Sequence, residues 1–286
     1  MQDKPEIIVH LGVHKTATTY LQSRLLNSKA RLKKDNISYV KLSSLRENVT
    51  SKLTEEKFSK SEVWQFLEPH LDGKLLILSD ENILGDTRKP VGGKLYPNAR
   101  ARLELLASIF DGINVSLYLT LREYATYLIS RYSESLRHFH FQTFDNYING
   151  IDLDNHGWLQ LVADVKAAFP QSNIYCNDFS YFINNEEEYF KRWFGVSIPL
   201  EPAKLSPAVR RAKLSLEAYE LINEFSNNYS KSQTKALVRF LDAHEQETEK
   251  TEFNPFTDSQ RRRLVEKYRS DIEEIQKDPA CYWIKM

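Results

Sequence analysis

Two short stretches of the sequence combine residue types that together bind anions. In the first, from Val9 to Thr19, a glycine, a lysine and three threonines follow an apolar run. A glycine permits a tight turn, and the first turn of a helix offers unpaired backbone N–H groups and a positive dipole end. The Lys15 ammonium adds a full charge, and the threonine hydroxyls add donors. This stretch predicts an anion site at the start of a helix, with a plain threonine helix cap as the alternative.

The second stretch is an arginine that ends an apolar run, with a serine eight residues later. Arg122 follows Leu119–Leu121, and Ser130 lies about two turns into the helix expected next. Ligands of an open parallel sheet bind beyond the carboxyl ends of its strands, where a guanidinium can hold a phosphate. Ser130 can reach the same anion only if its helix packs across that crevice. Taken alone, this stretch fits a surface salt bridge and a serine bonded back to its own helix better than it fits an anion site.

Both stretches need a sheet to bring them together. Short apolar runs predict buried strands and helical periodicity separates them; we expect strands at 7–11, 37–40, 75–78, 115–121 and 174–176, and helices from 16 and at 58–71, 101–110, 124–137 and 158–169. This alternation predicts an α/β fold, a parallel sheet flanked by helices on both faces. Beyond residue 207 the pattern predicts helices and no further strand. We expect one domain over residues 1–286, in which 206–280 form a helical cap or C-terminal extension.

Composition narrows the classes of protein. The chain has 286 residues, with 39 basic and 39 acidic side chains, so its formal charge is zero. A zero charge argues against a general nucleic-acid binder but permits one local anion site. Two cysteines, Cys176 and Cys281, exclude a disulfide framework and a four-cysteine zinc site. No apolar run approaches the roughly 18 residues of a membrane span, and the first residues do not resemble a targeting segment. We therefore expect a cytoplasmic protein.

The nearest common motif to the first stretch is the nucleotide P-loop, G-x4-G-K-[ST]. Lys15 and Thr16 match its end, but Val9 and His14 occupy its two glycine positions. This departure disfavours a standard ATP or GTP site.

Together the two stretches resemble the family of sulfotransferases that use 3′-phosphoadenosine 5′-phosphosulfate. The family's 5′-phosphosulfate loop commonly reads P-K-[ST]-G-T-T-x-L, and the matching residues are His14-Lys15-Thr16-Ala17-Thr18-Thr19-Tyr20-Leu21. Its 3′-phosphate element is an arginine at a strand end and a serine eight residues later, often within S-x-Y. Here these are Arg122, Ser130 and Tyr132. Residues 174–179, a strand ending in an acidic residue, resemble a later strand of the family more weakly.

The resemblance implies a three-layer sandwich like that of the P-loop NTPases, and transfer of a sulfuryl group from this cofactor to a hydroxyl of a small molecule or glycan, with a carbohydrate expected. It implies that the cofactor is held by Lys15, Thr16, Ala17, Thr18, Thr19, Arg122 and Ser130, without a metal ion. Lys15 would also be catalytic, because it would stabilise charge on the leaving oxygen. Neither a nucleic acid nor a membrane span is expected.

The sequence departs from the family pattern at three points. The loop glycine is Ala17, which is strained if its φ is positive and favourable if it lies in the first helical turn. Glu123-Tyr124 stands where a proline commonly follows the arginine. The family's basic loop near the C-terminus has no clean match, and its candidates are Arg210, Arg211 and Lys213, for which a solvated helix face is the alternative.

Glu81 is the expected general base for the acceptor hydroxyl. It follows the strand at 75–78, so it shares a carboxyl edge with Lys15 and Arg122. Asp80 is its immediate rival, because adjacent residues point to opposite faces, and His14 is the third choice.

Other chemistry-bearing side chains have plainer interpretations. His138 and His140 are interpreted as a surface pair rather than metal ligands. The loop at 84–98 and the aromatic stretch at 139–147 are candidates for an acceptor cleft, although core packing explains the aromatic residues equally well.

Two other functions remain open on the same residues. A small-molecule kinase would use the same strand, loop and helix with ATP and Mg²⁺. A non-catalytic module would bind a nucleotide or a partner without transfer, and Ala17 is the departure that keeps it open.

Overall fold

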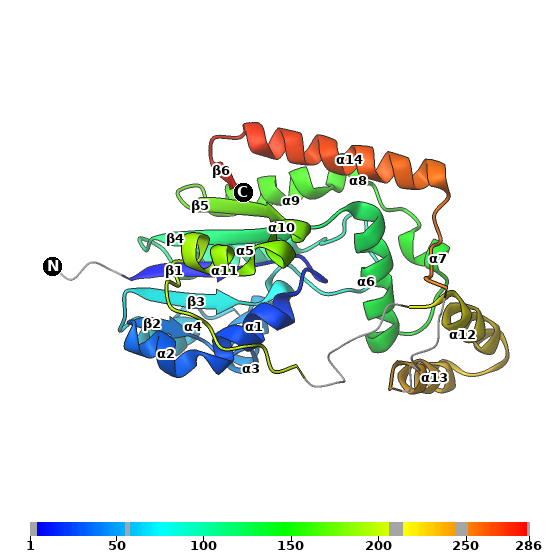
Figure 1. Cartoon of the computed structure of the whole chain (residues 1–286), viewed down its shortest axis with the longest axis horizontal. Coiled ribbons are helices and arrows are strands. Elements are labelled where there is room, and N and C mark those ends of the chain that lie inside the picture. Colours follow the sequence, from blue (N-terminus) through cyan, green and yellow to red (C-terminus); the bar gives the residue numbers. More distant parts are fainter. Residues whose placement is uncertain (1–4, 55–57, 206–213, 244–250, 285–286) are drawn as a thin grey trace.

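The computed structural model describes residues 5–54, 58–205, 214–243 and 251–284. Six strands in these ranges form one parallel sheet in the order β2-β3-β1-β4-β5-β6. They are β1 (Glu6–His10), β2 (Ile37–Tyr39), β3 (Leu75–Ser79), β4 (Val115–Leu121), β5 (Asn173–Asp178) and β6 (Cys281–Trp283). Helices cover both faces of the sheet (Figure 1), so the predicted α/β fold is confirmed.

The helices follow the sequence pattern, with additional short helices in the connections. They are α1 (Thr18–Asn27), α2 (Lys29–Lys34), α3 (Leu42–Leu45), α4 (Lys60–Leu67), α5 (Ala99–Ile109), α6 (Tyr124–His138), α7 (Phe144–Ile148), α8 (Leu153–His156), α9 (Trp158–Ala168), α10 (Phe179–Asn184), α11 (Glu186–Glu188), α12 (Leu216–Asn228), α13 (Lys231–Ala243) and α14 (Asp258–Lys277). Single turns lie at Arg46–Thr50, Lys52–Thr54, Glu68–His70, Glu81–Ile83 and Tyr189–Trp193. Among the described helices, none is long and apolar enough to cross a membrane.

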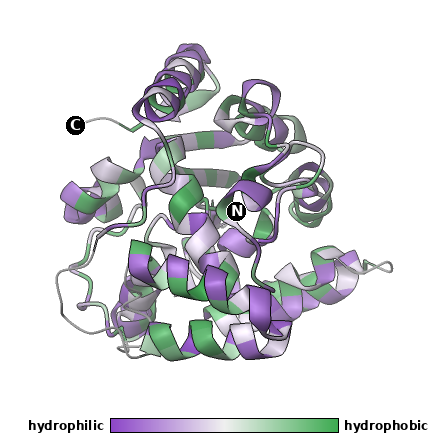
Figure 2. Ribbon diagram, turned by 90° about the vertical axis from the view of Figure 1, so that its right-hand side faces the viewer, coloured by the Kyte–Doolittle hydropathy of each residue, from purple (hydrophilic) through white to green (hydrophobic). Residues whose placement is uncertain are grey.

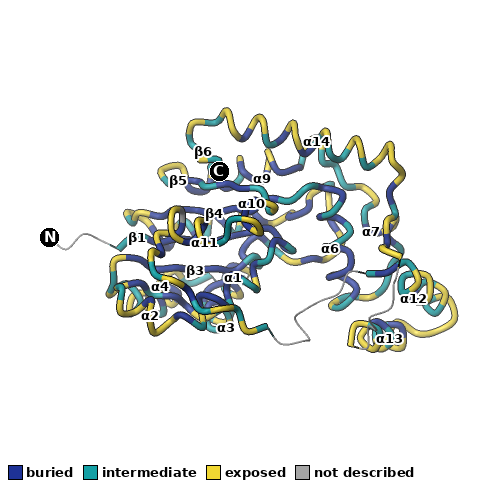
Figure 3. The backbone as a smooth tube through the Cα atoms, viewed as in Figure 1, coloured by how far each residue is buried: buried dark blue, intermediate teal, exposed yellow. Residues whose placement is uncertain are grey.

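The central strands are buried on both faces. Along β1, Ile7 and Val9 join one apolar cluster, and Ile8 joins the cluster on the other face. Such continuous apolar runs are typical of parallel strands covered by helices. Figure 3 shows these strands buried, while the outer turns of α14 are exposed. Hydrophilic and hydrophobic residues alternate along the covering helices (Figure 2), as expected of amphipathic helices with one face on a core.

The carboxyl-terminal segment corrects one sequence prediction. We expected no strand beyond residue 207, but Cys281–Trp283 pairs in parallel with β5 as β6. Asp278 turns the chain into this strand, because its carboxylate accepts from Ala280 N at 3.0 Å and its carbonyl accepts from Cys281 N at 3.0 Å. The short run Cys281-Tyr282-Trp283-Ile284 after Asp278-Pro279 carries the β-former signal that was missed.

Helix α6 stands across the carboxyl edge of the sheet (Figure 1). Its first turn is fixed to α14, because the Tyr124 hydroxyl donates to Asp271, which is almost fully buried. Its last turn meets α13, where Arg137 pairs with Asp242 at 2.6 Å. One helix therefore runs past every strand end that carries a candidate residue.

Candidate active site

The candidate residues follow three neighbouring strands. β1 lies between β3 and β4, and the chain leaves β1 toward β3 before it returns to β4 on the other side. A reversal of strand order of this kind opens a crevice at the carboxyl edge, where ligands of α/β sheets bind. Glu81 follows β3, the lysine loop at 11–17 follows β1, and Arg122 follows β4. The fold therefore brings the predicted residues to one edge.

The lysine loop has a tightly curved backbone. Gly12, Lys15 and Ala17 have positive φ angles of 49°, 67° and 59°. A Cβ at Gly12 would also lie 3.1 Å from Thr18 Oγ1, so a side chain at this position would meet both backbone strain and a close contact. The loop is fixed to β4, because Val13 N donates to the Thr120 carbonyl at 3.3 Å. The N–H groups of Gly12, Val13 and His14 donate to Tyr118, Thr120 and Tyr96, so these three groups hold the shape of the loop.

Lys15 is held at both ends. Its carbonyl accepts from Arg122 Nη1 at 2.7 Å, and its ammonium lies 3.2 Å from Glu134 Oε2 on α6. The contact between Lys15 and Arg122 joins the two anion-binding stretches, although 107 positions separate them in the sequence. The two stretches therefore lie side by side at the carboxyl edge of the sheet.

Helix α1 begins without a side-chain cap. Ala17 occupies the N-cap position, and its methyl side chain makes no capping hydrogen bond. Thr18 Oγ1 is buried and has no hydrogen-bond partner among the described residues. Thr16 instead bonds back to the Val13 carbonyl at 2.7 Å, and Thr19 is exposed. The unpaired N–H groups and the Thr18 hydroxyl fit an anionic group at this helix end.

The Ala17 backbone gives the first testable result. Because its φ of 59° is left-handed, Ala17→Gly should raise the free energy of unfolding by about 1 kcal/mol. That corresponds to a melting temperature higher by about 2 °C, measured by scanning calorimetry. The matched control is Ala101→Gly on the exposed face of α5, which should lower stability by a similar amount. Equal losses in both variants would contradict the assigned backbone.

The charged guanidinium of Arg122 lies in a partly apolar environment. Its Nε donates to Thr126 Oγ1 at 3.3 Å, and the guanidinium lies 5.0 Å from the centre of the Phe179 ring. Burial lowers the pKa of Arg122, so an anionic ligand would offset a real desolvation cost. Glu123, at the position where the family commonly has proline, caps α6 by accepting from Ala125 N and Thr126 N.

Ser130 lies on the face of α6 that meets the lysine loop. Thr126, Ser130 and Glu134 are four residues apart, so they line one face of the helix. The first contacts Arg122 and the last contacts Lys15, which puts the half-buried Ser130 between the two cations. Tyr132 is different, since it is buried in the core and its hydroxyl donates to the Gln142 carbonyl at 2.7 Å.

The three candidate bases differ in how they are held. Asp80 is fully buried, and its carboxylate accepts from Arg46, from Thr50 Oγ1 at 2.8 Å and from Asn82 N at 3.0 Å. Burial and the neighbouring Glu81 raise the pKa of Asp80. These contacts assign Asp80 a structural role at the end of β3.

Glu81 is more open than Asp80, with 14% of its side chain exposed. Its carboxylate accepts from Arg46 Nη2 at 3.1 Å and from Gln22 Nε2 at 3.3 Å. Gln22 belongs to α1, so Glu81 is tied to the helix that the lysine loop begins.

His14 is built into a buried hydrogen-bond chain. Its Nε2 lies 2.9 Å from Asn82 Oδ1, and its Nδ1 lies 3.0 Å from the Tyr96 hydroxyl, which lies 2.8 Å from the Tyr127 hydroxyl. An amide oxygen only accepts, so Nε2 carries the proton. Burial, and then the nearby Arg131, lower the pKa of His14 to about 4. With both nitrogens occupied, His14 serves the structure of the loop.

The buried histidines make stability depend on pH. Burial lowers the pKa of His10 to about 3, and that of His14 is about 4, against 6.5 in the unfolded chain. The unfolded state therefore binds more protons below pH 6.5, and the free energy of unfolding should fall as pH drops toward 4. Between pH 7 and pH 4.5 each histidine should cost about 3 kcal/mol. Urea unfolding measures this, and His10→Gln should flatten the profile; an identical profile would contradict the assignment.

Sequence reasoning missed Glu134 and Tyr96. Glu134 was one acid among many, yet its position four residues after Ser130 could have placed it on the same helix face. Tyr96 lies in the loop at 84–98, expected at the surface, but its ring is buried against His14. Phe144 and Tyr147 are core residues, so they do not line a cleft.

One of the two predicted histidines lies beside the site, because its partner Glu134 also contacts Lys15. His138 contacts Glu134 at 2.9 Å and is half exposed, and His140 is exposed. Among the described residues, no group of three histidine, cysteine or acidic side chains could hold a metal ion. Arg210, Arg211 and Lys213 lie outside the described residues.

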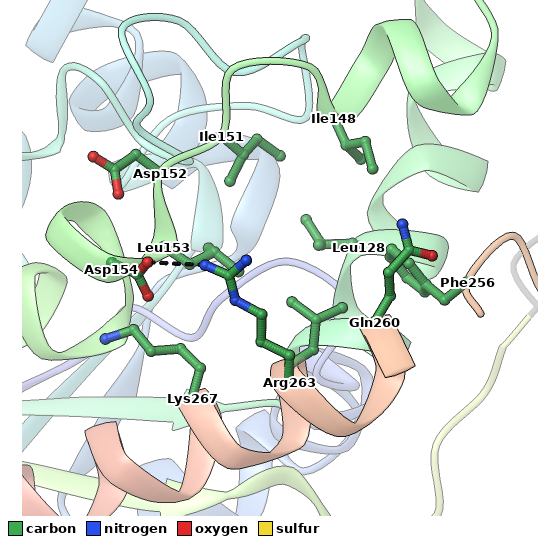
Figure 4. Close-up of a pocket in the computed structure, with 11 residues that line it drawn as sticks. Leu128, Ile148, Ile151, Asp152, Leu153, Asp154, Phe256, Gln260, Arg263 and Lys267 are labelled. Atoms are coloured by element: carbon green, nitrogen blue, oxygen red, sulfur yellow. Dashed lines mark hydrogen bonds and ion pairs between the residues drawn. The ribbon is translucent and has the colours of Figure 1, made fainter. Parts of the chain in front are cut away.

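A cavity of about 320 Å³ lies elsewhere, between α6, the segment before α8 and α14. Figure 4 shows Arg263 paired with Asp154 among the lining residues, which also include the apolar side chains of Leu128 and Ile151. Leu128 and Ser130 are two positions apart and face different sides of α6. This cavity is therefore separate from the candidate active site.

Comparisons with known proteins are sparse. No family model matches the chain, and no curated protein matches it. Among solved structures, the chain is similar to the crystal structure of a sulfotransferase from Alicyclobacillus acidocaldarius. The two have 12% sequence identity and a TM-score of 0.45, over 82% of this chain and 96% of that chain. A likeness this distant carries no argument about the reaction.

Proposed function

We propose that this protein is a transferase that moves a sulfuryl group from 3′-phosphoadenosine 5′-phosphosulfate to a hydroxyl acceptor, which we expect to be a carbohydrate. The observation that carries the proposal is the hydrogen bond of 2.7 Å between Arg122 Nη1 and the Lys15 carbonyl. It joins a lysine-bearing helix start to an arginine at a strand end, and a bisphosphorylated nucleotide presents one anionic group to each. Both cations lie at the carboxyl edge, where such ligands bind.

The residues present fit this cofactor on three counts. The start of α1 has no side-chain cap, Thr18 Oγ1 is buried without a partner among the described residues, and Arg122 is paired with no carboxylate in the same ranges. Lys15 and the α1 N-terminus would hold the 5′-phosphosulfate, and Arg122 and Ser130 would hold the 3′-phosphate. When bound, the cofactor supplies the sulfuryl group and a phosphate leaving group.

In this proposal the main contribution of the protein is to hold charged side chains in place around the reacting groups. Lys15 would stabilise the negative charge that develops on the leaving phosphate oxygen as its bond to sulfur breaks. Glu81, as general base, would take the proton from the acceptor hydroxyl as its oxygen bonds to sulfur. Arg46 and Gln22 fix the Glu81 carboxylate, so its orientation is set before an acceptor arrives.

A kinase is less consistent with the sequence. In a nucleotide P-loop, two glycines let the backbone N–H groups of the loop cradle the phosphates. Here Val9 and His14 occupy those two positions.

Titration calorimetry with adenosine 3′,5′-bisphosphate tests the proposal. We expect micromolar or tighter binding without a metal ion, and much weaker binding of adenosine 5′-phosphate. Transfer of labelled sulfate from the cofactor to a panel of glycans and small hydroxyl compounds would then identify the acceptor. Failure to bind the bisphosphate would overturn the proposal, and binding without transfer to any acceptor would favour the non-catalytic module.

A further inference from the structure

Glu134 is a buried acid at the centre of a cluster of basic side chains. It lies on α6, and 10% of its side chain is exposed. Its carboxylate lies 3.2 Å from Lys15 Nζ, 3.5 Å from Arg137 Nη1 and 2.9 Å from His138 Nε2. A carboxylate with this many basic partners is firmly anchored, so it can fix the position of one of them.

Lys15 needs such support. Its φ of 67° lies in the left-handed region, which residues with a Cβ avoid. Conformations of this kind persist where the surroundings over-determine them, and they cluster at active sites. Arg122 holds the Lys15 carbonyl and Glu134 holds the ammonium. The two contacts act on opposite ends of one residue, and together they fix both its backbone and its side chain.

We infer that Glu134 is the positioning residue for Lys15: it directs the ammonium to the point where charge develops during sulfuryl transfer. This inference rests on the proposed function and extends it to a residue outside both anion-binding stretches. Catalysis by a fixed charge depends on donors that are already in place when the reaction begins, and a displacement of about 1 Å can cost 100-fold in rate.

The same geometry predicts opposite effects on binding and on rate. Glu134 brings a negative charge to within hydrogen-bond distance of the group that would hold an anion, so it opposes ground-state binding of the nucleotide. Its removal should leave affinity unchanged or improved, while the ammonium loses its fixed direction and turnover falls. A residue that merely stabilised the fold would weaken binding and turnover together.

Glu134→Gln tests this, because it keeps the size of the side chain and removes its charge. We expect kcat to fall at least 10-fold, while the dissociation constant of adenosine 3′,5′-bisphosphate by calorimetry stays within threefold or becomes tighter. Asp242→Asn is the matched control, since Asp242 accepts from Arg137 at the outer end of the same network; both quantities should stay within twofold. Unchanged kcat in Glu134→Gln, or binding lost in step with kcat, would overturn the inference.

A double variant distinguishes an effect of Glu134 that acts through Lys15 from an effect of Glu134 on the rate that is independent of Lys15. In the Lys15→Ala background, Glu134→Gln should change the single-turnover rate less than twofold; a further 10-fold fall would refute the positioning role. Should Glu134→Gln fail to fold, Glu134→Asp is the substitute, because it keeps the charge beside Arg137 and His138 but draws it back from Lys15. For this variant we expect a smaller fall in kcat, again with the affinity for adenosine 3′,5′-bisphosphate unchanged or improved. If the wild type itself does not bind the bisphosphate, the proposed function fails, and this inference with it.

Discussion

Replacing Lys15 with alanine should lower the rate of sulfuryl transfer about 1,000-fold. The lost ammonium is the full positive charge that the lysine loop brings to the start of α1, and no neutral donor replaces a charge there. Affinity for adenosine 3′,5′-bisphosphate should fall about 10- to 100-fold, since hydrogen bonds to charged groups contribute about 1.5–3 kcal/mol. Single-turnover transfer of labelled sulfate and calorimetry measure the two effects separately.

The backbone is not the cause of that expected loss. Alanine has a Cβ, so the left-handed strain at position 15 remains, and the carbonyl still accepts from Arg122. Lys33→Ala on the exposed side of α2 removes a lysine of equal charge and should change neither quantity. Transfer by Lys15→Ala within 10-fold of the wild-type rate would contradict the role of Lys15.

Replacing Arg122 with alanine should reduce the preference for a nucleotide that carries a 3′-phosphate about 10- to 100-fold. Affinity for adenosine 3′,5′-bisphosphate should fall about 100-fold, because a guanidinium that holds a phosphate with paired hydrogen bonds is lost. Affinity for adenosine 5′-phosphate should fall about 10-fold at most, because that nucleotide loses only the support of Arg122 for the lysine loop. Calorimetry with both nucleotides gives the ratio of the two affinities.

A lysine at this position distinguishes charge from geometry. Arg122→Lys keeps a cation but cannot donate to Thr126, to the Lys15 carbonyl and to a phosphate from one planar group, so we expect an intermediate ratio. Arg263→Ala removes an arginine that is 79% exposed and paired with Asp154, and it should leave the ratio unchanged. If Arg122→Ala retains the wild-type preference, a different residue recognises the 3′-phosphate.

The sheet was predictable because its inner strands are continuous apolar runs. Ile7–Val9, Leu75–Leu78 and Val115–Leu121 are buried on both sides, which leaves little choice but a parallel sheet between helices. β6 was missed because it has three residues and follows a long charged helix. Its strand conformation comes from pairing with β5, a tertiary contact that local composition does not report.

The choice among acids at the end of β3 also needed the structure. Sequence reasoning ranked Glu81 above Asp80 but could not show that Arg46 and Thr50 would meet at Asp80. These partners lie 34 and 30 positions earlier in the sequence. The role of Glu81 as base stays a prediction, and the structure adds that the carboxylate is fixed by contacts from two elements.

Ala17 and Glu134 mark two different limits of sequence reasoning. For Ala17 the sequence left two conformations open, and the backbone has the left-handed one, with φ 59°. For Glu134, helical periodicity indicates a helix face but no neighbour, because only the placement of α6 across the sheet edge brings the carboxylate to Lys15. Helix periodicity fixes what lies on a face, and topology decides what that face meets.

The two ends of α6 are attached by different kinds of force. At its beginning, Tyr124 is buried against the Trp158 ring and donates to Asp271. At its end, polar contacts to α13 contribute to the attachment, where Arg137 meets Asp242 and Lys235 donates to the His138 carbonyl. Salt screens partly exposed ion pairs far more than buried contacts. A rise in salt concentration should therefore weaken the attachment of α6 at the end beside Glu134, while the end beside Arg122 stays attached.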